Sequence, residues 1–144
     1  GGRFFDELRD KQSLGYTVHA FATERSLAGS FVAYIATSPE KEEIARRGLL
    51  NEFAKLRDNV VAPEELSRAQ EYVIGSHAIA QESGGAQLGE MLDAWMFGAG
   101  LHELLEHDDR VRRVTAEQMR ELARKYFDPE KRVEGIVRGV GRTV

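Results

Sequence analysis

The segment FFDELRDKQSLGYTV, residues 4–18, contains the change of periodicity that decides the fold. Its first half carries apolar side chains at helical spacing, at Phe4, Phe5 and Leu8, with charged residues between them, which predicts a short helix. The serine and glycine that follow are poor residues for a helix interior, so the helix is expected to end there. From Tyr16 the apolar side chains alternate with period two, which predicts a strand.

The predicted strand is followed by a turn and a second strand. The stretch TERSLAG has the composition of a connecting turn, and SFVAYIAT, residues 30–37, is rich in β-branched and aromatic side chains. We therefore expect residues 16–23 and 30–37 to pair as an antiparallel hairpin. RVEGIVRGV predicts a third short strand near residues 133–138.

The rest of the chain is predicted to be mostly helical. Ser38 and Pro39 suit the start of one helix, a second helix begins near VVAPEEL, and ESGGAQ marks a break before a third. Thr115 and Gln118 have the spacing of a capping box ahead of the last helix. Consecutive helices and few strands indicate an α+β fold, with a mostly antiparallel sheet and helices packed on one face. We expect residues 1–144 to form a single domain.

A sheet of three strands is thin for five or six helices, so we expect further strands to precede Gly1.

The composition narrows the function classes. A net charge of −4 argues against a general nucleic-acid or anionic-membrane binder. No apolar run approaches the length of a membrane span, so we expect no membrane span and a soluble domain whose compartment the sequence does not fix. The chain has no cysteine, which removes disulfides and thiolate chemistry.

The stretch HELLEHDD contains the most conspicuous cluster of candidate metal ligands. His102 and His107 are five residues apart, about 140° around an ideal helix, whereas two zinc ligands on a helix need a spacing of three or four. A solvated helix end is the favoured interpretation, and no metal ligands are assigned in this chain. His19 and His77 are interpreted as structural. The serines lack a nucleophile-elbow context, so the sequence shows no complete catalytic constellation.

Arg9 and Tyr16 are the remaining candidates. One interpretation is an arginine in an ion pair at the helix end and a tyrosine packed at the start of a strand. The other is functional: a guanidinium and a phenol that converge can hold a peptide carbonyl and stabilise the oxyanion formed when water attacks it. Both interpretations stay open on the residues alone.

Four segments of the chain, in order between residues 4 and 137, resemble the pitrilysin/insulinase family of zinc metallopeptidases, the inverzincins. FFDELRDKQSLGYTV resembles L-F-x-E-L-R-x-K-x-x-L-x-Y-x-V, and GSFVAYIATSPEK resembles G-x-F-x-x-Y-x-G-T-x-P-E. PEELSRAQEYVIGS resembles E-E-L-x-x-A-K-x-x-L-x-G-S, and VRRVTAEQMRELARKYFDPEK resembles I-x-x-V-T-A-E-D-V-x-x-V-A-x-K-Y-L-D-P. The chain departs from the family at KQSLGY, residues 11–16, where the family commonly has K-R-G-L-A-Y.

The resemblance implies the C-terminal, substrate-binding half of such a peptidase, of the LuxS/processing-peptidase fold type and here without its N-terminal strands. It implies that Arg9 and Tyr16 contact peptide substrate and act in catalysis. The family's H-x-x-E-H signature is absent from this chain. Zinc is therefore expected on a partner, the N-terminal half or another subunit. The alternative is a non-catalytic core or scaffold subunit of a processing-peptidase-like assembly.

Overall fold

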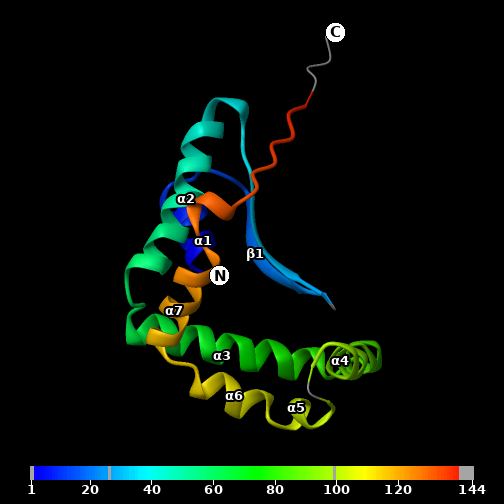
Figure 1. The fold of residues 1–144 in the computed structure, drawn as a ribbon. Coiled ribbons are helices and arrows are strands. Elements are labelled where there is room, and N and C mark those ends of the chain that lie inside the picture. Colours follow the sequence, from blue (N-terminus) through cyan, green and yellow to red (C-terminus); the bar gives the residue numbers. More distant parts are fainter. Residues whose placement is uncertain (1, 26, 99, 140–144) are drawn as a thin grey trace.

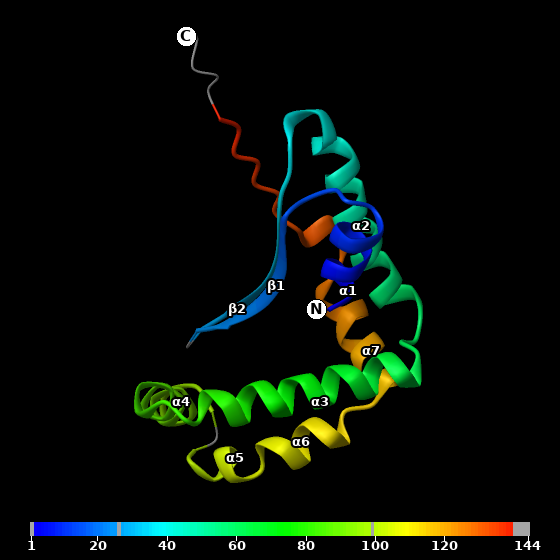
Figure 2. The same cartoon turned by 180° about the vertical axis from the view of Figure 1, so that it is seen from behind.

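The protein is described here by a computed structural model that covers residues 2–25, 27–98 and 100–139. These residues contain seven α-helices and one two-stranded antiparallel sheet, so the α+β class predicted from the sequence is confirmed. The elements form two arms set at an angle (Figures 1 and 2). Helices α2 (Glu42–Asp58) and α7 (Ala116–Tyr126) lie side by side in one arm. Helix α3 (Pro63–Ala80) and α6 (His107–Arg113) form the other arm.

The chain begins with a helix that changes its winding. Helix α1 (Arg3–Phe5) continues into η1 (Asp6–Lys11), a π-helical segment with a wider turn than the ordinary helix expected from the sequence. The segment ends where the Leu14 amide donates to the carbonyl of Leu8 at 2.8 Å. Ser13 adopts a φ of 50°, the left-handed region in which a side chain is unfavourable.

The predicted hairpin is confirmed to within one residue at each end. Strand β1 (Thr17–Glu24) pairs antiparallel with β2 (Gly29–Ala36), with Val18 opposite Ile35. Because side chains alternate across a strand, this pair faces the helices, whereas His19 and its partner Tyr34 lie on the other face. On that outer face Tyr34 remains 47% exposed.

The helices begin close to the start signals found in the sequence. A 3-10 turn, η2 (Pro39–Lys41), precedes α2, although the Ser38 side chain makes no capping hydrogen bond. The Thr115–Gln118 capping box is present at the start of α7. The other elements are α4 (Gly84–Met96), α5 (His102–Leu105) and the 3-10 turn η3 (Pro129–Lys131).

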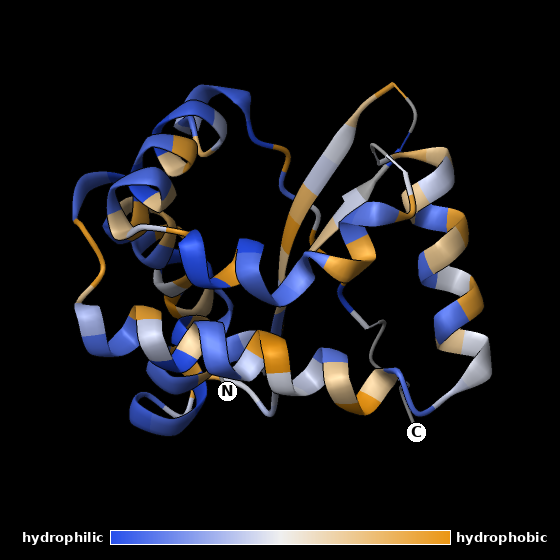
Figure 3. Ribbon diagram, turned by 90° about the horizontal axis from the view of Figure 1, so that it is seen from below, coloured by the Kyte–Doolittle hydropathy of each residue, from blue (hydrophilic) through white to orange (hydrophobic). Residues whose placement is uncertain are grey.

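The core forms where α1, η1, the base of the hairpin and α2 meet. Leu8 is completely buried there. A group of four phenylalanine rings extends the core toward α7: Phe53 packs against Phe4, Phe31 and Phe127 with centroid distances of 5.1, 5.8 and 4.9 Å. Figure 3 shows apolar residues on the strands and on the helices around them. Residues 2–18 are therefore anchored to α2 by the buried side chains among them.

The prediction of a third strand near residues 133–138 is wrong. These residues form no strand, and Val133 and Val137 are 98% and 100% exposed. Two ion pairs hold the segment against α2. Arg46 binds Glu134 at 2.6 Å, and Glu42 binds Arg138 at 2.7 Å. In the described part of the chain β1 and β2 pair only with each other, so no strand edge receives this segment. It leaves the helices past the base of the hairpin (Figure 1).

Among the described residues, no helix combines the length and the apolar composition that a membrane crossing requires.

Candidate functional site

The corner between η1 and β1 brings together the two side chains singled out in the sequence. Arg9 lies in η1, and Tyr16 immediately precedes β1. The guanidinium carbon of Arg9 lies 5.0 Å from the centroid of the Tyr16 ring and 4.4 Å from that of Phe5. Both distances are in the range of a cation–π interaction. Arg9 therefore holds its planar group against two rings, one on the helix and one at the strand.

The exposure of the two side chains differs. Tyr16 is 84% exposed, so its phenol is accessible to a ligand, whereas Arg9 is half-buried. Among the described residues, Arg9 contacts the rings of Phe5 and Tyr16 and forms no ion pair, unlike the ion pair considered from the sequence. The convergence of Arg9 and Tyr16 is thus a feature of the structure, and their roles stay predictions.

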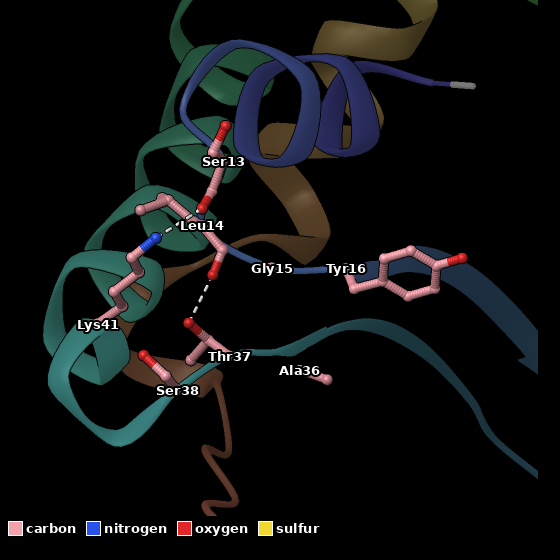
Figure 4. A pocket seen from close by; sticks show the side chains of 8 residues that line it. All are labelled: Ser13, Leu14, Gly15, Tyr16, Ala36, Thr37, Ser38 and Lys41. Carbon is pink, nitrogen blue, oxygen red and sulfur yellow. Dashed lines mark hydrogen bonds between the residues drawn. The ribbon is translucent and has the colours of Figure 1, made fainter.

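An open hollow of about 410 Å³ lies beside the corner (Figure 4). Two hydrogen bonds along its wall fix the backbone that leads to Tyr16. The Thr37 hydroxyl donates to the carbonyl of Leu14 at 2.5 Å, and the Lys41 ammonium donates to the carbonyl of Ser13 at 2.9 Å. Tyr16 lines the rim of the hollow. The start of α2 and the end of β2 therefore support the corner.

Gly15, next to Tyr16, packs tightly against β2 in this structure. A Cβ atom on Gly15 would lie 2.3 Å from the carbonyl oxygen of Ala36 and 2.9 Å from a side-chain carbon of Ile35. The backbone of the corner therefore runs in direct contact with β2. This close approach contributes to the rigidity with which Tyr16 is presented.

The histidines of HELLEHDD do not face each other. Helix α5 ends at Leu105 and α6 begins at His107, so His102 and His107 lie on separate short helices. His107 instead stacks on His77 of α3, with ring centroids 3.8 Å apart. This pairing has no signal in the sequence, because His77 and His107 are thirty positions apart and only the packing of α6 on α3 joins them.

Two carboxylates complete this second cluster. The Nδ1 of His107 lies 3.0 Å from Oδ1 of Asp108, and the Nε2 of His77 lies 3.1 Å from Oε2 of Glu90. The hydrogen bond from His107 lowers the pKa of the Asp108 carboxyl from its ordinary value. Asp108 is therefore an anion at neutral pH. The cluster joins α3, α4 and α6.

A family model described as the peptidase M16 inactive domain matches residues 1–73. This match includes α1, η1, the hairpin and α2, which together form the core and the Arg9–Tyr16 corner. The chain belongs to the peptidase M16 inactive-domain family, the C-terminal domain of the M16/pitrilysin zinc proteases. The family resemblance found in the sequence is confirmed.

Relatives of known sequence agree with this assignment. An uncharacterized zinc protease of Rickettsia felis is 31% identical over 80 residues, which are 56% of this chain and 19% of that protein. An uncharacterized zinc protease of Streptomyces coelicolor is 24% identical over 125 residues, 85% of this chain and 27% of that protein. The chain thus spans about a fifth of one of these curated relatives and just over a quarter of the other.

Solved structures share the fold. A peptidase M16 inactive domain from Pseudomonas fluorescens matches with a TM-score of 0.73 and 25% identity, over 89% of this chain and 31% of that one. The inactive peptidase domain of a protein from Bordetella parapertussis matches with a TM-score of 0.75 and 18% identity. That match covers 99% of this chain and 78% of the other.

Proposed function

We propose that this chain is the substrate-binding half of a zinc-dependent metalloendopeptidase, and that Arg9 and Tyr16 act on the peptide carbonyl at which the bond is cleaved. The observation that carries the proposal is the Arg9–Tyr16 stack, with its guanidinium 5.0 Å from the ring and its phenol exposed. Membership of the M16 inactive-domain family supplies the reaction class. The role of the two side chains follows from their chemistry.

The residues of this chain would act as donors. The phenol of Tyr16 donates a hydrogen bond to the carbonyl oxygen, and this bond strengthens as the oxygen gains negative charge in the transition state. The Arg9 guanidinium packs on one face of the Tyr16 ring and holds it in place. It also brings a positive charge close to the developing oxyanion. A zinc ion on the partner half would lower the pKa of the water that attacks the carbonyl. The partner half is expected to carry it because H-x-x-E-H is absent from this sequence.

The proposal includes a larger sheet in the whole protein. The hairpin exposes one face, where Phe21 is 44% exposed, and both strand edges are unpaired within the described residues. Isolated two-stranded sheets are marginally stable, and exposed edges accept further strands. We take residues 1–144 as one domain that is a large C-terminal fragment of a peptidase half, and its sheet is extended by strands that lie elsewhere in the parent protein.

The test is the substitution Tyr16→Phe in the whole peptidase, assayed on a fluorogenic peptide. This change keeps the ring over Arg9 and removes the donor, so kcat should fall on the order of 100-fold while the melting temperature stays unchanged. Tyr72→Phe is the matched control, because Tyr72 is 65% exposed on α3, away from the corner. Wild-type turnover in Tyr16→Phe contradicts the catalytic role.

The scaffold alternative predicts a different result at the first step. A non-catalytic core subunit would show no peptide hydrolysis in the whole protein, even with zinc added and with Arg9 and Tyr16 intact. Hydrolysis that depends on zinc and on Tyr16 decides for the peptidase.

A further inference from the structure

A second cluster of ligand-type side chains lies on the other arm of the molecule, away from the Arg9–Tyr16 corner. We propose that His77, His107 and Asp108 form a zinc-binding site between helices α3 and α6. One ligand atom from each of the three lies within 4.8 Å of the other two. From the sequence, no metal ligand was assigned in this chain and His77 was interpreted as structural. The packing of the two helices adds the third residue.

The two helices are held in register by an independent contact. The side-chain amide of Gln70 in α3 donates to the carbonyls of Val111, Arg112 and Val114, at 3.1, 3.2 and 3.0 Å. His77 is seven residues after Gln70, and His107 is seven residues before Val114. We call this contact the Gln70 clamp. About two turns of each helix therefore separate the clamp from the cluster of His77, His107 and Asp108. The position of His107 against His77 follows from helix packing as well as from the stacking of the two rings.

The proposed site uses the Nε2–H tautomer of His77. The Nε2 of His77 lies 3.1 Å from Oε2 of Glu90, which can only accept, and 3.2 Å from the amide nitrogen of Gln81, which can only donate. In the Nε2–H tautomer the ring donates to Glu90, and its Nδ1 presents a lone pair. This nitrogen faces Asp108 Oδ1 at 3.8 Å, too far for a hydrogen bond. Two acceptors facing each other at this distance leave room for a cation between them.

Glu90 has the position of an outer-shell residue. Histidines that bind a metal usually donate their second ring nitrogen to a carboxylate, which fixes the tautomer and makes the binding nitrogen more basic. The Nε2–Glu90 contact of His77 is this arrangement. Gln81 also donates to the same carboxylate oxygen. Glu90 is therefore held in place by a second partner.

The separations suit zinc. Bonds of about 2.0–2.1 Å in a tetrahedral site place neighbouring ligand atoms roughly 3.4 Å apart. The observed separations from Asp108 Oδ1 are 3.0 Å to His107 Nδ1 and 3.8 Å to His77 Nδ1, on either side of that value. The imidazole planes are nearly parallel, at 26°, so binding requires the His107 ring to turn about χ2, a soft torsion, while His77 stays on Glu90.

Binding requires the other tautomer of His107. In the metal-free form the Nδ1–H of His107 donates to the Asp108 carboxylate. Zinc at Nδ1 takes the place of this proton while Nε2 takes one up, so the ring stays neutral, and the affinity falls at low pH because a doubly protonated imidazole has no lone pair. The side chains of His77, His107 and Asp108 are 17%, 30% and 48% exposed, so water can reach the fourth position. Two imidazole nitrogens and one carboxylate oxygen are a ligand set that zinc accepts.

The test is zinc binding by the metal-stripped 144-residue chain, measured in competition with a chromophoric chelator. We expect one zinc per chain and a rise in melting temperature with zinc. His77→Ala and His107→Ala should each weaken binding by about tenfold or more, and Glu90→Gln should weaken it by about 10- to 100-fold with the three ligands intact. Cobalt in place of zinc should give the visible absorption of a four-coordinate site.

The controls use the two other histidines of the chain. His19→Ala and His102→Ala remove exposed imidazoles outside the cluster and should leave the affinity unchanged. The melting temperature of each metal-free variant shows that it is folded. The proposal is wrong if the folded wild-type chain binds no zinc stoichiometrically, or if His77→Ala binds as tightly as His102→Ala. It is also wrong if the NMR ring resonances of His77 and His107 shift with pH but do not respond to zinc.

Discussion

The guanidinium carbon of Arg9 lies 5.0 Å from the centre of the Tyr16 ring, although seven residues and the change from helix to strand separate them. Phe5 covers the same guanidinium at 4.4 Å. The contact links the end of η1 to the start of the hairpin. A phenol that is 84% exposed is thus supported by a positive charge rather than by burial.

Arg9→Lys in the whole peptidase tests whether the planar guanidinium matters. Lysine keeps the charge near Tyr16 but cannot stack over two rings or donate in a fork. We expect kcat/KM to fall about tenfold or more, with part of the loss in KM. Exposed cation–π contacts contribute about 0.5–1 kcal/mol, so the melting temperature should fall little. Unchanged kinetics with a lowered melting temperature would assign Arg9 to stability alone.

Ser13→Gly should stabilise the protein. Serine at a φ of 50° costs roughly 1–2 kcal/mol, and glycine removes that cost. Glycine also increases the entropy of the unfolded chain, which costs about 0.5–1 kcal/mol. The net gain in the free energy of unfolding should be about 0.5–1 kcal/mol, measured by urea denaturation. A loss of stability would show that Ser13 does not occupy the left-handed region.

Gly15→Ala should have the opposite effect, two positions along the same corner. The added Cβ overlaps the backbone carbonyl of Ala36 at 2.3 Å, so the strand has to move. We expect a loss of about 1–3 kcal/mol in the free energy of unfolding. Tolerance of alanine here would mean that the backbone of the corner is looser than the structure has it.

The sequence predicted the local features well, because each depends on neighbouring residues. The period change at Tyr16, the hairpin, and the Thr115–Gln118 capping box are all present. Arg9 and Tyr16, which the sequence singled out, also lie in contact, while their role stays a prediction. What the spacing did not show was that Arg9 stacks on Tyr16, since this depends on the π-helical winding of η1.

Two features escaped sequence reasoning because they depend on long-range packing. A short apolar stretch such as residues 133–138 forms a strand only beside a strand edge, and here ion pairs with α2 hold it instead. The approach of His77 to His107 depends on how α6 docks on α3. Neither helix carries a local pattern that specifies this docking.

The Arg3–Glu65 pair predicts a pH dependence of stability. Arg3 binds the Glu65 carboxylate through two nitrogens, at 2.8 and 2.6 Å, and joins α1 to the first turn of α3. The hydrogen bond from Arg3 lowers the pKa of Glu65 from its usual value, against a smaller effect of burial. A lowered folded-state pKa means that the contribution is present above the unfolded pKa of about 4.3 and is lost as the pH falls through the folded value.

Glu65→Gln should therefore cost about 0.5–1 kcal/mol at pH 7, a modest figure because solvent screens a pair that is partly exposed. The difference from the wild type should shrink as the pH falls below the unfolded pKa of about 4.3, and vanish once the pH is below the lowered folded-state pKa of Glu65. Glu64→Gln is the matched control, since Glu64 lies exposed in the same turn of α3. The free energy of unfolding of both proteins is measured by urea denaturation between pH 3 and pH 7. A difference that stays constant over this range contradicts the electrostatic origin.

The Gln70 clamp gives a prediction whose sign reverses with pH. Gln70→Ala removes the amide that donates to three carbonyls at the end of α6, and should cost about 1 kcal/mol. Gln70→Glu places an acceptor against the same carbonyls, so at pH 7 it should cost more than alanine does. Faster amide exchange in α6 is expected in both variants, because the end of this helix is released from α3.

At low pH the glutamate can recover part of the function of the amide. The carbonyls around position 70 disfavour a carboxylate, so the folded-state pKa of the new glutamate lies above its unfolded value of about 4.3. The penalty is then full above the folded value and disappears as the pH falls through it. A protonated carboxyl donates one hydrogen bond, so below about pH 4 Gln70→Glu should become more stable than Gln70→Ala. If alanine stays the better residue at every pH, the clamp does not hold α6 on α3 through these carbonyls.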